Sequence, residues 1–163
     1  MEGVRRRRYV RAMALDTALD QLHVRLLRAG AQPPARSRPG DAGYDLRTAE
    51  SFSLWPGERV TVPTGVAVAL PPGVAGLVVP RSGLAASHGI SVVNGPGLID
   101  PNYRGEIRVV LVNLGDARFE AATGDRIAQL VLMPFLAPDT CVVDELPPSP
   151  DDRGENGFGS SGR

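Results

Sequence analysis

The ten residues GLIDPNYRGE, at positions 97–106, place a carboxylate, a tyrosine and an arginine around one turn signal. Pro101 fixes its own φ and disfavours helix at the residue before it, so Asp100 is expected at a strand end or in a turn. A carboxylate at the rim of a rigid sheet suits a general base, because the strand behind it fixes its geometry. The alternative is an Asx-type turn in which Asp100 only caps backbone donors. Glu106 then opens an apolar run, IRVVLVN, which predicts a buried strand.

Two other segments carry a polar side chain in a position that could bind a ligand. DAGYDL places Asp45 at a junction between a turn and a strand. This aspartate could be a metal-associated carboxylate or simply the aspartate of a turn. In GDRIAQL, Gln129 alternates with apolar neighbours. It could bind a ligand or satisfy backbone groups in the core.

Two further segments are candidate anion sites. In PRSGLA, Arg81 and Ser82 are followed by free backbone N–H groups, and a forked guanidinium beside successive donors suits phosphate oxygens. The alternative is a β-turn with a surface arginine. The tail RGENGFGSSGR, at 153–163, is rich in glycine, which lets a backbone approach an anion closely. Because it lacks the lysine of a P-loop, it is not an NTPase phosphate loop, and its alternative is a flexible linker end.

The composition narrows the chemistry that this chain of 163 residues can perform. All 18 basic residues are arginine, which excludes a lysine nucleophile or Schiff base. The single Cys141 excludes an intramolecular disulfide and a cysteine-clustered zinc site, and two histidines are too few for a histidine-rich metal centre. A net charge of zero gives no argument for a nucleic-acid or anionic-membrane partner. No apolar run is long enough to span a membrane.

Glycine and proline punctuate short runs rich in Val, Leu and Ile. The 19 glycines and 15 prolines are spread along the chain, a pattern typical of an all-β sandwich or barrel. The pattern predicts strands at 22–27, 43–49, 52–55, 59–70, 74–80, 89–94, 106–113, 118–121 and 126–137. Helix is expected only over 14–21, with a single helical turn near 82–86.

The same signals predict one β domain flanked by two tails. The domain is expected over residues 22–144, and 145–163 is expected to be a flexible arm with too little apolar surface to fold alone. Residues 1–21 form an N-terminal extension that we expect to be disordered. Its RRRR run invites a nucleic-acid or targeting interpretation, but a solvated tail, or a translation start at Met13, is favoured. The cytoplasm is the default compartment.

Five segments together resemble a known family. AGYDL, PRSGLA, VVNGPGLIDPNYRGE, GDRIAQL and RGENGFGSSG resemble, in order and spacing, the motifs of the trimeric deoxyuridine triphosphate nucleotidohydrolases, the dUTPases. The resemblance implies a distorted jelly-roll, β-clip-like subunit that assembles as a homotrimer, with each site built from all three chains and closed by a flexible arm. It also implies hydrolysis of dUTP to dUMP and pyrophosphate, which removes dUTP from the nucleotide pool and supplies dUMP for thymidylate synthesis.

The resemblance assigns roles around the base and sugar, carried over position by position. Asp100, ionised at neutral pH, deprotonates a water that attacks the α-phosphorus of dUTP. Tyr103 lies against the deoxyribose and leaves no room for the 2′-hydroxyl of UTP. The side chain of Asn94 and the main chain of Leu98 and Ile99 hold uracil. Such a pocket rejects cytosine because mismatched polar groups would be buried unpaired.

The resemblance also implies phosphate and metal contacts. The phosphate ligands implied are Arg81, Ser82, Gly83 and Gln129, joined by Arg153, Gly159 and Ser160 from the arm. Phe158 stacks on uracil, and Arg108 is a weaker substrate contact. Asp45 orients a Mg²⁺ ion through water molecules, which fits the tendency of magnesium to keep its hydration shell while it bridges phosphates.

Two other functions compete with this interpretation. A dCTP deaminase resembles dUTPases in fold and in part of the aspartate motif, but Asn94, Tyr103 and the aromatic arm favour a dUTPase. A regulatory protein that keeps the fold and signals through a partner is motivated only by the basic N-terminal extension. The sequence departs from many relatives at Gly95 and Leu98, and at 155–156 in the arm.

Overall fold

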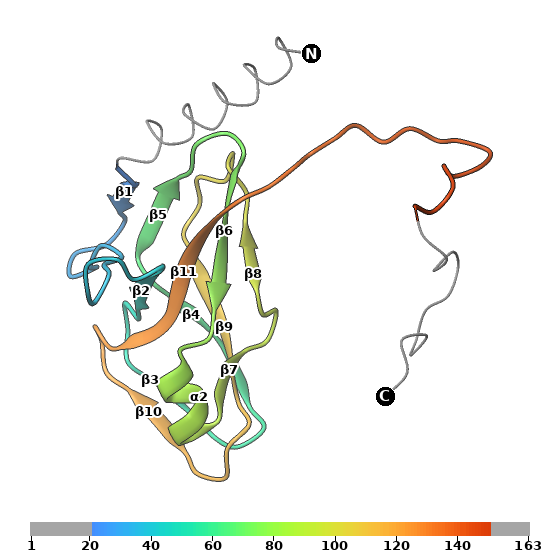
Figure 1. Ribbon diagram of the computed structural model, residues 1–163. Coiled ribbons are helices and arrows are strands. Elements are labelled where there is room, and N and C mark those ends of the chain that lie inside the picture. Colours follow the sequence, from blue (N-terminus) through green and yellow to red (C-terminus); the bar gives the residue numbers. More distant parts are fainter. Residues whose placement is uncertain (1–20, 151–163) are drawn as a thin grey trace.

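The computed structural model describes residues 21–150, and almost all of their regular structure is β-strand (Figure 1). Short apolar runs separated by glycine and proline turns produce this architecture. In chain order the elements are β1 (His23–Leu26), β2 (Gly43–Arg47), β3 (Phe52–Leu54), β4 (Arg59–Pro63), β5 (Val66–Ala69), β6 (Val74–Val79), α2 (Ser82–His88), β7 (Ile90–Val92), β8 (Gly97–Ile99), β9 (Arg108–Asn113), β10 (Phe119–Ala121) and β11 (Arg126–Pro134).

The strands form four small antiparallel sheets. The largest has the order β2-β11-β6-β8, and a three-stranded sheet has the order β4-β9-β7. Two pairs, β1 with β5 and β10 with β3, complete the described fold. Neighbours in these sheets are mostly far apart in sequence, as in a jelly-roll, so strands from both halves of the chain meet in one core.

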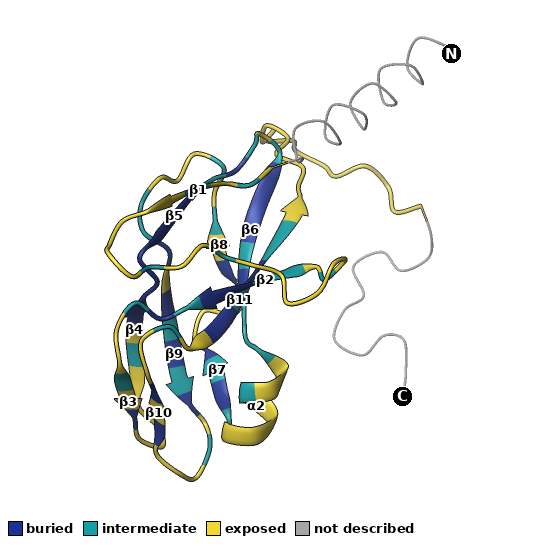
Figure 2. Ribbon diagram, turned by 90° about the vertical axis from the view of Figure 1, so that its left-hand side faces the viewer, coloured by how far each residue is buried: buried dark blue, intermediate teal, exposed yellow. Residues whose placement is uncertain are grey.

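The core lies between these sheets and consists mainly of Val, Leu and Ile. Among its most deeply buried members are Leu46, Ile107, Leu111 and Leu130, each at most 1% exposed. Figure 2 shows buried residues along β6, β9 and β11 and exposed ones on α2 and in the loops. Burial of branched side chains from several strands gives a rigid frame for the loops at its edges.

Several expected elements differ from the observed ones. The run at 59–70 is two strands, because Gly65 between them has a φ of +69° and an added Cβ would lie 2.7 Å from the Cβ of Ala31. β8 was not among the strands predicted from periodicity, β9 begins at Arg108, and β11 ends at Pro134. The helical turn near 82–86 is a helix of seven residues. The helix expected over 14–21 lies, apart from its last residue, outside the described residues.

After β11 the chain leaves the sheets. Residues 135–150 contain no helix or strand, and Figure 1 shows them running away from the body of the molecule. Apolar side chains on this segment are uncovered: Leu136 and Val142 are each 94% exposed. Within the described part of the chain, no helix has the length and apolar character needed to cross a membrane.

Candidate active site

A pocket of about 190 Å³ lies beside β8, and we call it the β8 pocket. Its buried wall consists of three valines on β6, β7 and β9: Val78, Val92 and Val109. The remaining lining residues are Asn94, Gly97, Leu98, Ile99, Asp100, Tyr103, Glu106 and Arg108. The pocket therefore gathers six residues that the sequence placed at the site: Asn94, Leu98, Ile99, Asp100, Tyr103 and Arg108. Its volume is below the range of about 300–1,000 Å³ typical of pockets for drug-sized ligands, so it suits one part of a larger ligand.

Asp100 lies directly after β8, as expected from the proline that follows it. The Asp100 carbonyl accepts a hydrogen bond from the Tyr103 N–H at 3.1 Å, so the turn is closed by backbone groups. Asp100 is exposed, and its carboxylate accepts no hydrogen bond from any residue in 21–150. The alternative in which this carboxylate caps the turn therefore has no support. A carboxylate on a fixed turn, with both oxygens free of protein donors, is available to a water or a ligand.

The turn between β7 and β8 supplies the next side of the pocket. Asn94 and Leu98 are exposed, with Leu98 at 62%, whereas Ile99 packs against the core. The absence of a side chain at Gly97 leaves room for the Asn94 amide, because an added Cβ would lie 3.3 Å from both the Asn94 Nδ2 and the Val78 Cβ. At Gly95, an added Cβ would lie 3.0 Å from the Val92 carbonyl oxygen. A side chain at this position would therefore need a small shift of the turn.

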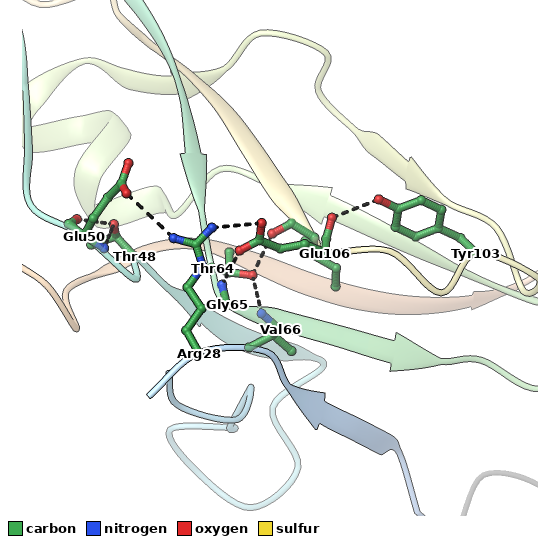
Figure 3. Close-up of polar contacts among 9 residues, drawn as sticks. Arg28, Thr48, Glu50, Thr64, Gly65, Val66, Tyr103 and Glu106 are labelled. Carbon is green, nitrogen blue, oxygen red and sulfur yellow. Dashed lines mark hydrogen bonds and ion pairs between the residues drawn. The ribbon is translucent and has the colours of Figure 1, made fainter. Parts of the chain in front are cut away.

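Tyr103 is held at the hydroxyl end of its ring (Figure 3). Its hydroxyl donates to the Glu106 carbonyl at 2.9 Å. The ring lies over Gly105, where an added Cβ would overlap the hydroxyl and come within 2.6 Å of Cζ. Glu106 lines the pocket but was not among the predicted site residues, because its place at the start of an apolar run indicated only a strand boundary.

A second group of polar side chains, the Asp45 cluster, consists of Asp45, Ser37, Arg81 and Arg126. Ser37 donates to the Asp45 Oδ2 at 2.8 Å, and the Arg126 Nη1 donates to the same oxygen at 3.2 Å. The Arg81 Nε lies 3.3 Å from Oδ1. Asp45 was expected at a turn-to-strand junction. In agreement with the strand expected at 43–49, it is the third residue of β2, and its side chain is buried.

The electrostatics of this cluster keep Asp45 charged. Burial is the largest single influence and opposes ionisation, but hydrogen bonds from Ser37 and Arg126 and the charges of Arg81 and Arg126 together outweigh it. The pKa of Asp45 is therefore lowered below its ordinary value of 3.8. The cluster is a buried anion between two cations, with a guanidinium surface left for a further anion.

The other predicted phosphate ligands lie around this cluster. Ser82 and Gly83 begin α2 directly after Arg81, whose Nη1 donates to the Arg126 carbonyl at 3.0 Å. Gln129 on β11 is paired with Asp45 on one side and Val79 on the other. Its side chain makes no hydrogen bond within the described region, so it does not serve the core in the way that the alternative interpretation required. Thus β2, β11 and the end of β6 bring these residues together.

The side chains of the Asp45 cluster can be compared with the ligands that a magnesium ion prefers. No group of three or more His, Cys, Asp or Glu side chains in residues 21–150 could hold a metal. Asp45 is a lone carboxylate, and both of its oxygens face arginine or serine. This donor set does not suit direct ligation by several carboxylates. It fits a hydrated magnesium ion held mainly by substrate phosphates, with one nearby carboxylate orienting its waters.

Asp100 in the β8 pocket and Arg81 in the Asp45 cluster lie toward opposite ends of β6. β8 runs antiparallel to β6, with Ile99 opposite Gly76, so Asp100 lies toward the start of β6. Arg81 follows the other end of this strand, which leads into α2 (Figure 1). The five residue-to-residue steps from Gly76 to Arg81 span about 16 Å at the usual rise of a strand. Within one chain, Asp100 and Arg81 are therefore well separated along the sheet.

Four predicted site residues cannot be placed. Arg153, Phe158, Gly159 and Ser160 lie outside the described residues.

Comparison with known proteins gives a consistent family. A family model described as dUTPase matches residues 30–162. The chain is 55% identical to a deoxyuridine 5′-triphosphate nucleotidohydrolase of Leifsonia xyli over 79% of this chain and 84% of that protein. It is 50% identical to the protein of the same name from Anaeromyxobacter over 86% and 97% of the two chains.

Solved structures agree with this result. The dUTPase of Staphylococcus bacteriophage 80α bound to dUPNHPP is 33% identical, with a TM-score of 0.78, over 88% of this chain and 99% of that chain. An aspartate-to-asparagine variant of the dUTPase from phage phi11 of S. aureus, described for its coordination of a structural Mg(II) ion, is 30% identical with a TM-score of 0.72, over 77% and 98% of the two chains. Motifs, fold and relatives agree, and the chain belongs to the dUTPase family.

Proposed function

We propose that this protein hydrolyses dUTP to dUMP and pyrophosphate, with the base and sugar bound in the β8 pocket. The observation that carries the proposal is the unpaired carboxylate of Asp100 on a backbone-closed turn, next to Asn94 and a fixed Tyr103. Membership of the dUTPase family supports the choice of nucleotide. We expect the enzyme to act in the cytoplasm, where it removes dUTP and supplies dUMP.

Asp100 is the proposed general base. It takes a proton from a water whose oxygen attacks the α-phosphorus of dUTP. The bond from the α-phosphorus to the oxygen that bridges to the β-phosphorus then breaks, and pyrophosphate leaves with the bonding electrons. The exposed position of Asp100 suits this step, because the carboxylate is free of protein donors that would compete for the water.

The proposed selectivity for uracil and deoxyribose comes from the rest of the pocket. The Asn94 side chain and the main chain of Leu98 and Ile99 face the base, and a site with fixed donors and acceptors rejects cytosine. Tyr103 lies against the sugar and excludes a 2′-hydroxyl, and the hydrogen bond from its hydroxyl to the Glu106 carbonyl supports this role by holding the ring. Arg108 at the pocket rim is a weaker contact, and its side chain has no partner among residues 21–150.

The proposed phosphate ligands are Arg81, Ser82, Gly83 and Gln129. Arg81 turns its Nε toward Asp45 and one Nη1 toward a carbonyl, so the rest of its fork remains for phosphate oxygens. Asp45 would hold Mg²⁺ through water, as its single-carboxylate surroundings allow. When bound, the ion aligns the triphosphate and spreads its developing charge.

We further propose that the active enzyme is a homotrimer with shared sites. The separation of about 16 Å between the two ends of β6 supports this, because Asp100 and Arg81 must approach the same triphosphate. The small β8 pocket and the uncovered apolar residues after β11 support it as well. We propose a domain over 22–144 and an arm over 145–163 that brings Arg153, Phe158, Gly159 and Ser160 to a neighbour's site. No nucleic-acid or membrane partner is proposed.

Release of pyrophosphate from a panel of nucleoside triphosphates tests the function. With Mg²⁺ present, pyrophosphate is expected from dUTP and at far lower rates from dCTP, dTTP and UTP. Deaminated product from dCTP would instead indicate a dCTP deaminase. Loss of a partner interaction on deletion of residues 1–12, with no hydrolysis of dUTP by the full chain, would indicate a regulatory protein.

A further inference from the structure

Residues 64–66, which are the two residues after β4 and the first residue of β5, hold the segment that precedes β9, and we call them the loop at 64–66. The Ile107 N–H donates to the Val66 carbonyl at 2.8 Å, and the Thr64 hydroxyl donates to the Ile107 carbonyl at 2.6 Å. The Gly65 N–H donates to the Oε1 of Glu106 at 2.8 Å. One loop thus holds both the backbone and the side chain of this segment (Figure 3).

These hydrogen bonds fix the direction of the backbone carbonyl of Glu106, a residue that lines the β8 pocket. Glu106 C=O and Ile107 N–H belong to the same planar peptide unit and point in opposite directions. The N–H is bound to Val66, so the C=O is turned to the other side, where it accepts the Tyr103 hydroxyl at 2.9 Å. The position of the Tyr103 ring therefore depends on the loop at 64–66.

The carboxylate of Glu106 makes the side-chain contact with the loop at 64–66. It is 16% exposed, and its Oε2 lies 3.3 Å from Arg28, whose side chain is 42% exposed. An ion pair with such an exposed partner contributes little. Loss of the hydrogen bond to Gly65 costs more free energy, because it leaves the buried N–H of Gly65 without a partner. It also releases the loop at 64–66 from Glu106.

We propose that Glu106 is a positioning residue that acts through Gly65 and its own carbonyl to fix Tyr103, and that it thereby sets the discrimination between deoxyribo- and ribonucleotides. This inference rests on the proposed function, in which Tyr103 lies against the sugar. Glu106 touches no reacting atom in this role. Glu106 instead limits how far the Tyr103 ring can move when the nucleotide carries a 2′-hydroxyl.

The test compares kcat/KM for dUTP and UTP in variants of the full-length enzyme. Glu106→Ala is expected to lower the dUTP-to-UTP ratio about tenfold, the scale on which an imperfect pocket fails to reject one added hydroxyl. Glu106→Gln keeps an oxygen for the Gly65 N–H and is expected to restore the wild-type ratio. Arg28→Ala is expected to leave the ratio unchanged, because it removes only the exposed pair.

Two further variants separate positioning from general stability. Tyr103→Phe removes the hydroxyl bond and should lower the ratio to a similar extent; combined with Glu106→Ala it should add little, because both act on one contact. Glu58→Ala is the matched control. The Oε2 of Glu58 accepts a hydrogen bond from the Trp55 N–H at 2.9 Å, and Glu58 lies outside the β8 pocket. The dUTP-to-UTP ratio of Glu58→Ala should therefore stay at the wild-type value.

A ratio within twofold of wild type in soluble Glu106→Ala or in Tyr103→Phe would overturn the inference. If Glu106→Ala does not fold, Glu106→Asp takes its place, because the shorter side chain keeps the charge but does not reach Gly65. Tyr103→Phe decides if neither folds. Failure of the proposed function is a different result: the wild-type enzyme then releases no pyrophosphate from dUTP, and no ratio exists to compare.

Discussion

Asp45 is the buried carboxylate on which two arginines converge. Replacement by asparagine removes its charge and leaves Arg81 and Arg126 facing each other across a neutral amide. Asp45→Asn is expected to lower the free energy of unfolding by about 2 kcal/mol, below the 3–5 kcal/mol of fully buried pairs because both arginines reach solvent. Urea unfolding of both proteins in EDTA measures the difference.

The pH dependence of that difference follows from the direction of the Asp45 pKa shift. A lowered folded-state pKa stabilises the protein fully above the unfolded value, which is near 3.8. The advantage of wild type over Asp45→Asn should therefore be constant near neutral pH. It should shrink as the pH falls below about 3.8 and through the lower folded-state pKa. An advantage that grows on acidification would contradict the ion-pair account.

Local sequence predicted one of the two residue groups better than the other. Asp100 and Tyr103 are joined by a short turn, so proline and spacing were enough to place them together. The partners of Asp45 lie far along the chain, and only the pairing of β2 with β11 brings Arg126 to it. The role of Glu106 was missed for a similar reason, because its partner Gly65 lies on another loop.

The break between β4 and β5 depends on Gly65. Gly65→Ala is expected to lower the free energy of unfolding by about 2–4 kcal/mol, through its positive φ and a clash with Ala31. Gly73→Ala is the matched control. Gly73 also has a positive φ, of 80°, but an added Cβ would meet nothing within 4 Å. Equal losses in melting temperature for the two variants would show that the clash contributes nothing.

Strand positions were predictable where apolar periodicity was strong. All the strands expected from it appear, with shifted ends, because alternation and turn residues are local signals. The run at 59–70 was predicted as one strand but is two. The close approach of Ala31 to Gly65 involves residues far apart in sequence, so local periodicity does not reveal it. β8 was missed because its three residues, GLI, are too few to show a period.

The proposed sharing of sites between chains can be tested by mixing two inactive variants. Arg81→Ala and Asp100→Asn chains should each be nearly inactive alone, since each lacks one half of every site. Refolded together in equal amounts, they should recover activity at about a quarter of the sites, those that combine an intact Asp100 with another chain's intact Arg81. No recovery, in assemblies shown by native mass spectrometry to contain both chains, would contradict sharing between chains.

The sequence could indicate an assembly only through its resemblance to a family, because no residue pattern reports a symmetric contact. The fold supplies the physical reason: β6 separates Asp100 from Arg81 by about 16 Å in one chain.

The most direct test of the central claim is the turnover of Asp100→Asn. Asparagine keeps the size and exposed turn position of Asp100 but cannot take a proton from water, so kcat for dUTP should fall by several orders of magnitude. Binding of a non-hydrolysable dUTP analogue should remain close to wild type, because the carboxylate acts mainly in the transition state. Turnover and binding that fall together by the same factor, or a kcat within tenfold of wild type, would contradict the role of Asp100 as general base.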